Sequence, residues 1–170
     1  MREQQEASED AVMTRIGQAV ILLHAGDREE ARNRLGAIWS EIGEEGDCLH
    51  RCTLAHYMAD AQDDPADELA WDLRALTAAE ALRGGPPASR EQDPAMRAFY
   101  PSLHLSLAAD YVKLHRPDAA RVHLARARAA TGALSDDGYG NGVRAAIARL
   151  ERRLATEPGT GPRPFPEQSP

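Results

Sequence analysis

Apolar residues return every three or four positions along most of the chain, which is the period of an amphipathic helix. Near the start, residues at i, i+4, i+7 and i+11 form one apolar helix face: Val12, Ile16, Ala19 and Leu23. The same spacing recurs near the other end, in 143–154. Runs of β-branched and aromatic residues with a period of two are absent, so we expect no strands. The pattern predicts an all-α fold.

Capping and breaking residues divide this pattern into helices. Ser8, followed by two acidic residues, predicts the start of the first helix, and residues 1–7 are expected to be a flexible N-terminus. Gly26 predicts its end, and Asp27 predicts the cap of the next helix. We expect Pro94 to restart helix but Pro101 to interrupt it, leaving a short turn before a longer helix.

The resulting organisation is a single helical domain at 8–156 with seven helices. We expect helical hairpins at about 8–46, 47–83 and 94–133, a capping helix at about 136–156, a loop at 84–93, and a disordered Pro-rich tail at 157–170.

Length and composition agree with one domain of 170 residues. The longest fully apolar run, 19–23, is far too short to span a bilayer, so no membrane contact is expected. The polar, acidic start does not resemble a secretory signal. The two cysteines, four residues apart, are predicted to be free thiols in a reducing, cytoplasmic setting.

Charge is distributed unevenly along the chain. The total is −7; residues 1–96 carry 9 basic and 20 acidic side chains, hence −11, and residues 97–170 carry 11 and 7, hence +4. Two differently solvated faces would account for this distribution, as would a bipolar surface that orients a partner or promotes self-association. The net negative charge argues against nucleic-acid binding, and we interpret the arginines of the last helices as a solvated face.

The stretch Gly46–Asp60 holds two cysteines and two histidines, which raises the question of a metal site. On a helix, Cys52 and His56 share an edge, whereas His50 points about 160° away from Cys52. Such a pair supplies two ligands at most, and structural zinc takes four. We therefore expect no metal and no cofactor.

The order Cys52, His56, Asp60 also imitates a thiol triad. Side chains on successive turns of one helix point outward in parallel, and no anion-binding loop accompanies them. We expect instead a helix whose buried stripe includes Leu54 and Met58, with His56 and Asp60 as a polar pair, and we expect no enzymatic activity. The tryptophans at 39 and 71 are predicted to be core anchors between hairpins.

Spacings within the hairpins resemble the tetratricopeptide repeat. In that family a large residue on the first helix of a unit lies nine residues before a small residue on the second. Tyr111 and Ala120 have this spacing, and so do Leu22 and Ala31. Ala25–Asp27 resembles the family's usual turn.

A third unit lies between these two, with eleven residues from Met58 to Leu69. The tryptophan that often opens the family's first helix is replaced by Arg15, Arg51 and His104. The resemblance covers about residues 8–130, and the last helix resembles a cap. It implies antiparallel hairpins stacked as a short right-handed superhelix.

The resemblance also implies a function, namely that of a scaffold or adaptor that binds a peptide or helix of another protein in a concave groove. Mapping the family's inward positions gives the expected groove residues: His24, Cys52, His56, Asp60, Leu105, Ala109 and Lys113. The alternative is a regulatory sensor of the same fold, in which the groove takes a small ligand.

Overall fold

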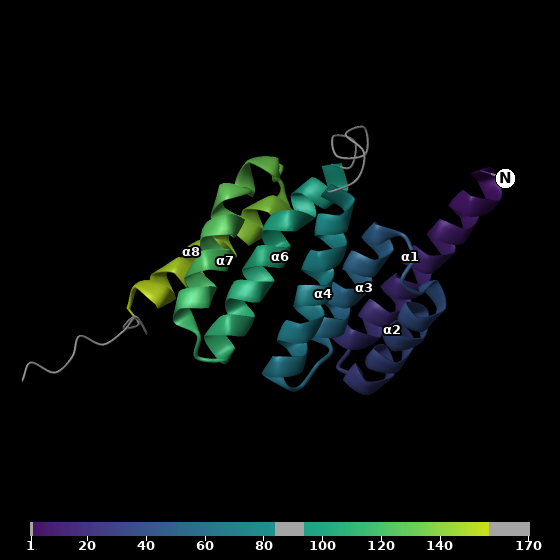
Figure 1. Cartoon of the computed structure of the whole chain (residues 1–170), viewed down its shortest axis with the longest axis horizontal. Helices are drawn as coiled ribbons and strands as arrows, with labels where there is room; N and C mark the ends of the chain where they lie inside the picture. Colours follow the sequence, from purple (N-terminus) through teal and green to yellow (C-terminus); the bar gives the residue numbers. More distant parts are fainter. Residues whose placement is uncertain (1, 84–93, 157–170) are drawn as a thin grey trace, which may run out of the picture. The chain divides into compact units, whose positions relative to one another are not determined.

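The computed structural model describes residues 2–83 and 94–156, and within these it contains seven α-helices, one 3-10 turn and no strand (Figure 1). The predicted all-α class is confirmed. The chain divides into two compact units, Met1–Met96 and Arg97–Pro170, and each is described by itself. The division falls within the predicted domain 8–156. The predicted loop 84–93 and tail 157–170 lie outside the described residues.

The first unit contains four helices joined by short turns: α1 (Arg2–His24), α2 (Arg28–Ile42), α3 (Cys48–Asp60) and α4 (Pro65–Arg83). Asp27 and Asp47 cap α2 and α3 as predicted. The Asp27 carboxylate accepts from the Glu30 N–H at 3.4 Å, and Asp47 accepts from the Leu49 N–H at 2.9 Å.

Helix α1 begins at Arg2, not at Ser8, so the expected flexible N-terminus is helical from residue 2. Residues 2–7 read REQQEA, and each of these types is a good helix former. A residue type that often caps a helix start can also lie inside a helix when the residues before it are good helix formers. This explains why the helix begins before Ser8.

The core of the first unit is built from the stripes that the period predicted. Helices α1, α2 and α3 each contribute two fully or nearly fully buried residues: Ile16, Ala19, Leu35, Ile38, Leu54 and Met58. Trp39 of α2 and Trp71 of α4 pack half-buried against this cluster. As the sequence predicted, these two side chains connect the first hairpin with the second.

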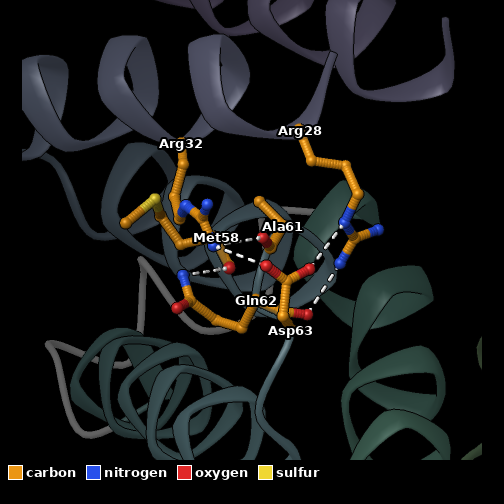
Figure 2. A network of polar contacts seen from close by, with 6 residues as sticks. All are labelled: Arg28, Arg32, Met58, Ala61, Gln62 and Asp63. Atoms are coloured by element: carbon orange, nitrogen blue, oxygen red, sulfur yellow. Dashed lines mark hydrogen bonds and ion pairs between the residues drawn. The ribbon is translucent and has the colours of Figure 1, made fainter. Parts of the chain in front are cut away.

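A polar network fixes the turn between α3 and α4 to α2 (Figure 2). Arg28 and Arg32 of α2 reach Asp63 at 3.1 and 3.2 Å, and Arg28 also donates to the Gln62 carbonyl at 2.7 Å. Hydrogen bonds from Arg32 and Arg28 hold the pKa of Asp63 below its ordinary value. Both arginines are thus committed to a structural contact within the unit.

The second unit contains α6 (Pro94–Lys113) from Arg97 onward, α7 (Pro117–Ala129), the 3-10 turn η1 (Thr131–Ala133) and α8 (Gly138–Ala155). Pro101 does not interrupt α6, which contradicts the prediction of a short turn followed by a separate helix. Its ring is fully buried, so apolar burial opposes the cost of the missing backbone hydrogen bond. The core of this unit joins Ala108, Leu124 and Ile147 from its three helices.

The turns after α1 and α6 have the same hydrogen bonds. After α1, the Asp27 N–H donates to the Leu22 carbonyl at 2.9 Å, around Gly26 with φ 93°. After α6, the Arg116 N–H donates to the Tyr111 carbonyl at 2.8 Å, around His115 with φ 57°. Each is a Schellman turn with one residue in the left-handed region.

Glycine is required at the start of α8. The Asp137 carboxylate caps this helix by accepting from the Gly140 N–H at 2.7 Å. A Cβ atom on Gly140 would lie 2.0 Å from the Ser135 carbonyl oxygen, which no side chain tolerates. No helix in the described part of the chain is long and apolar enough to cross a membrane.

Candidate functional site

A hollow of about 770 Å³ opens on the first unit, where α2 ends, α3 begins and α4 passes beside them. We call it the arginine–tryptophan groove and define it by its lining residues: Trp39, Ser40, Gly43, Glu44, Cys48, Arg51, Arg74, Thr77, Ala78 and Ala81. Its position follows from local sequence. Gly43, with φ 64°, ends α2, and the Asp47 cap starts α3 a few residues later.

Two tryptophans form the structural base of this region. The rings of Trp39 and Trp71 meet edge to face, with centroids 5.2 Å apart and planes at 84°. This arrangement brings the positive edge of one indole to the negative face of the other. Because the rings come from different hairpins, their contact fixes the relative positions of α2 and α4.

Each tryptophan carries an arginine on its face. The guanidinium carbon of Arg51 lies 4.3 Å from the Trp39 ring centroid, and that of Arg74 lies 4.2 Å from the Trp71 centroid. Both distances are within the range of cation–π attraction. Arg51 also donates to the Gly43 carbonyl, which fixes the plane of its guanidinium.

The pairing of these arginines differs from that of the other described arginine side chains of the unit. Those side chains all bind carboxylates: Arg15 pairs with Glu41, Arg28 and Arg32 with Asp63, and Arg34 with Glu30. Among the described residues no carboxylate pairs with Arg51 or Arg74. The groove therefore presents two positive charges held by rings.

The residues expected to line a concave groove fall in both units. In the first unit, His24 and Asp60 are exposed, His56 is half-buried and Cys52 is completely buried. A docked partner would not touch Cys52 in this conformation, because its neighbours cover it. In the second unit, Lys113 is exposed and Leu105 and Ala109 are half-buried, with Leu105 packed against the core.

The cysteine–histidine stretch forms a helix, α3, with its side chains in separate environments. Burial, together with the nearby Cys48 and Asp72, raises the pKa of the Cys52 thiol to about 12. A thiol with this pKa stays protonated at neutral pH, which argues against a nucleophile.

His56 finds its partner on another helix. Its Nδ1 lies 3.7 Å from Oδ1 of the buried Asp72 of α4. Burial acts to lower the pKa of His56, but Asp72 and the charge of Asp60 outweigh it, so the pKa is raised. The sequence predicted Asp60 as the acidic neighbour of His56. Asp72 is a second one, which no pattern in the sequence indicated.

In the second unit, two histidines lie within a row of aromatic rings. Nδ1 of His104 on α6 lies 3.0 Å from Nδ1 of His123 on α7, and the rings are stacked. Tyr111 also stacks with His123, and Tyr100 meets His104 edge to face. Burial and the charge of Arg126 lower the pKa of His123, which favours the neutral ring, the form in which its Nδ1 can accept this hydrogen bond.

Sequence reasoning missed the two arginines as site residues. One signal was present: Trp71 and Arg74 stand three residues apart on a predicted helix, which places them on one face. The stacking of Arg51 on Trp39 joins two different helices, so no local spacing indicates it. Comparisons with protein-family models, with curated proteins and with solved structures gave no match.

Proposed function

We propose that the chain is a non-catalytic helical-repeat module that binds another protein, and that the arginine–tryptophan groove is a contact surface for this partner. The observation that carries the proposal is a solvent-accessible groove with Arg51 and Arg74 stacked on tryptophans. Arginine and tryptophan are among the residue types most enriched at positions that dominate protein–protein binding energy. Stacking also limits their freedom before binding, so less conformational entropy is lost on docking.

Three further observations support a repeat scaffold of the tetratricopeptide type. The turns around Gly26 and His115 share one hydrogen-bond pattern. Nine residues separate the large and small positions in these two hairpins, Leu22 from Ala31 and Tyr111 from Ala120. Both small residues, Ala31 and Ala120, are completely buried. The protonated Cys52 thiol supports a binding role over a catalytic one. The predicted contacts through His24, His56 and Asp60 in the first unit, and Leu105, Ala109 and Lys113 in the second, remain part of the proposal.

A small-ligand sensor is the alternative, and the volume of the groove is compatible with one. The exposure of the groove favours the protein partner. Arg74, Thr77 and Ala81 are exposed along one wall and Ser40 and Glu44 along another. A small ligand would keep much of its surface in water there, whereas a partner chain would cover the walls.

The test begins with site-specific crosslinking. A photoreactive residue at Ser40, in the groove, is expected to capture a defined partner in the native cells, and the same residue at Ala145, exposed on α8, is not. The captured protein is then purified and its affinity measured by calorimetry.

Charge reversal of the groove tests the contact itself. Arg51→Glu with Arg74→Glu is expected to weaken binding of the captured partner at least tenfold, about 1.4 kcal/mol. Because Arg51 also bonds to the Gly43 carbonyl, binding is measured at a temperature at which the melting curve shows the variant to be folded. The matched control, Arg34→Gln, removes an arginine of the same unit outside the groove and leaves binding unchanged. Equal capture from Ser40 and Ala145, or normal binding by the charge-reversed variant, would refute the assignment.

A further inference from the structure

We infer that the groove recognises an acidic peptide segment in which a carboxylate stands next to an apolar side chain. The inference rests on the proposed protein-binding function and adds the chemistry of the partner. It is carried by the geometry of the two guanidinium groups, by the apolar surface beside them and by the charge of the unit that holds them.

The stacked guanidinium groups are arranged to receive planar anions. A guanidinium whose carbon lies over an indole ring, as in Arg51 and Arg74, keeps its five N–H donors in a rigid planar group. A carboxylate matches the edge of this group with two parallel hydrogen bonds, which are shorter and stronger than neutral ones. The ring contacts hold both guanidinium groups in place before the ligand binds, and Arg51 is also held by its hydrogen bond to the Gly43 carbonyl.

The surroundings explain why a carboxylate would find these two arginines and not the others. Arg28, Arg32 and Arg34 already have carboxylates of this chain as partners. Arg51 and Arg74 instead lie over tryptophan rings, whose quadrupoles attract a cation but leave its positive charge unneutralised. Among the residues that line the groove, Glu44 is the single acidic one, so the local balance is positive.

The apolar half of the recognised motif follows from the rest of the lining. Trp39, Ala78 and Ala81 offer carbon surface beside the two cations. An aliphatic or aromatic side chain that covers this surface also excludes water from the adjacent ion pair, which strengthens it. A carboxylate with no apolar neighbour would leave the pair exposed and weak.

The charge of the whole unit selects a short motif over a polyanion. Residues 1–96 carry a formal charge of −11, from 9 basic and 20 acidic side chains. Nucleic acid or an anionic lipid surface would bring many negative charges close to this negatively charged unit. These charges repel those of the unit over about 10 Å, the screening length near 0.1 M salt. A segment with one or two carboxylates meets the two arginines with little of that repulsion.

The experiment compares three blocked hexapeptides by calorimetry against the full chain: Ala-Glu-Leu-Glu-Phe-Ala, its glutamine counterpart Ala-Gln-Leu-Gln-Phe-Ala, and the acidic Ser-Glu-Ser-Glu-Ser-Ser, which has no apolar side chain. The first is expected to bind at least tenfold more tightly than either of the others. Arg51→Gln and Arg74→Gln should each lower its affinity about tenfold, and Arg34→Gln should leave it unchanged. Heparin serves as the polyanion and is expected to bind more weakly than the first peptide.

A second readout does not depend on the arginine variants. Cys48 lines the groove and is half-buried, so a bound peptide should slow its alkylation by iodoacetamide. If the glutamine peptide binds and protects Cys48 as well as the acidic one, carboxylate recognition is wrong while protein binding stands. The inference is also overturned if heparin binds more tightly than the first peptide, or if none of the three peptides binds. The proposed function is judged separately, by the crosslinking from Ser40.

Discussion

At the scale of single residues, one turn of α3 separates two cysteines with different surroundings. Cys48 is half-buried at the edge of the groove, whereas Cys52 is completely buried and its pKa is raised to about 12 by burial, by Cys48 and by Asp72. Reactivity of a thiol depends on both exposure and thiolate content.

We therefore predict that a thiol reagent modifies one cysteine of the native protein near neutral pH, and that this cysteine is Cys48. Mass spectrometry of tryptic peptides after brief treatment with iodoacetamide locates the label, and denaturation should release the second thiol. Cys48→Ser is expected to remove nearly all reaction of the native protein. Rapid labelling of Cys52 in that variant would mean that α3 is far more open than its packing indicates.

Helix α3 also shows which features of a single residue can be predicted from sequence and which cannot. The periodic stripe correctly placed Leu54 and Met58 in the core, because burial follows the helical period. The period could not identify Asp72 as the partner of His56, because that contact joins α3 to α4. A position's face can be derived from its own helix, but its partner depends on how two helices pack.

At the scale of elements, local chemistry determined most helix boundaries. Asp27 and Asp47 cap their helices, and Gly26 and Gly43 adopt the positive φ values expected after helices. The two boundaries that sequence missed, at Ser8 and at Pro101, depend on competition. Strong helix formers precede Ser8, and burial offsets the lost hydrogen bond of Pro101.

The turn after α6 yields a prediction of increased stability. His115 occupies a left-handed position, where a side chain costs about 1–2 kcal/mol and glycine costs less. After allowance for the greater freedom of glycine in the unfolded chain, His115→Gly is expected to stabilise the protein by about 0.5–1 kcal/mol. Urea denaturation measures this, and His115→Val, which is β-branched, should destabilise. A stability loss in the glycine variant would contradict the turn geometry.

The start of α8 yields a pair of opposite effects. Gly140→Ala is expected to destabilise by about 2 kcal/mol or more, because its Cβ would overlap the Ser135 carbonyl. Gly142 lies two residues later, and a Cβ added there would meet nothing within 4 Å beyond its own turns of helix. Gly142→Ala should therefore stabilise by about 0.5–1 kcal/mol. Thermal melting of both variants measures the two changes in stability. If both substitutions stabilised the protein, the close contact at Gly140 would be contradicted.

At the scale of the whole molecule, one histidine in each unit has a shifted pKa, and the two shifts have opposite directions. In the first unit, burial opposes but does not overcome the effect of Asp72 and Asp60, and the pKa of His56 is raised. Its stabilising contribution is complete below the ordinary value of 6.5 and is lost as pH rises through the raised value. In the second unit, burial and Arg126 lower the pKa of His123, so its contribution is present above 6.5 and is lost as pH falls through the lowered value.

We predict that proton NMR titration places the pKa of His56 above 6.5 and that of His123 below it. The substitutions His56→Gln and His123→Gln assign the two resonances. Between those two pKa values, hydrogen exchange corrected for intrinsic rates should show the first unit losing protection and the second gaining it as pH rises. Identical pKa values for the two histidines would mean that Asp72 and Arg126 do not act as the structure indicates.

The groove illustrates what could not be derived at this scale. Trp39 and Trp71 were predicted to anchor the hairpins, and they do meet. Their contact creates a site because Arg51 and Arg74 arrive from α3 and α4 on the same region. These two tryptophans and two arginines come from three helices, so the site emerges from packing and no stretch of sequence contains it.

The meeting of Trp39 and Trp71 also determines how the molecule can be observed by light. These are the two tryptophans of the chain, and both belong to the first unit. Indole emission is therefore an optical signal of that unit alone, whereas far-ultraviolet ellipticity sums the helices of both. Superimposable denaturation traces from the two signals would mean that the units unfold together, and an earlier change in emission would give the first unit a transition of its own.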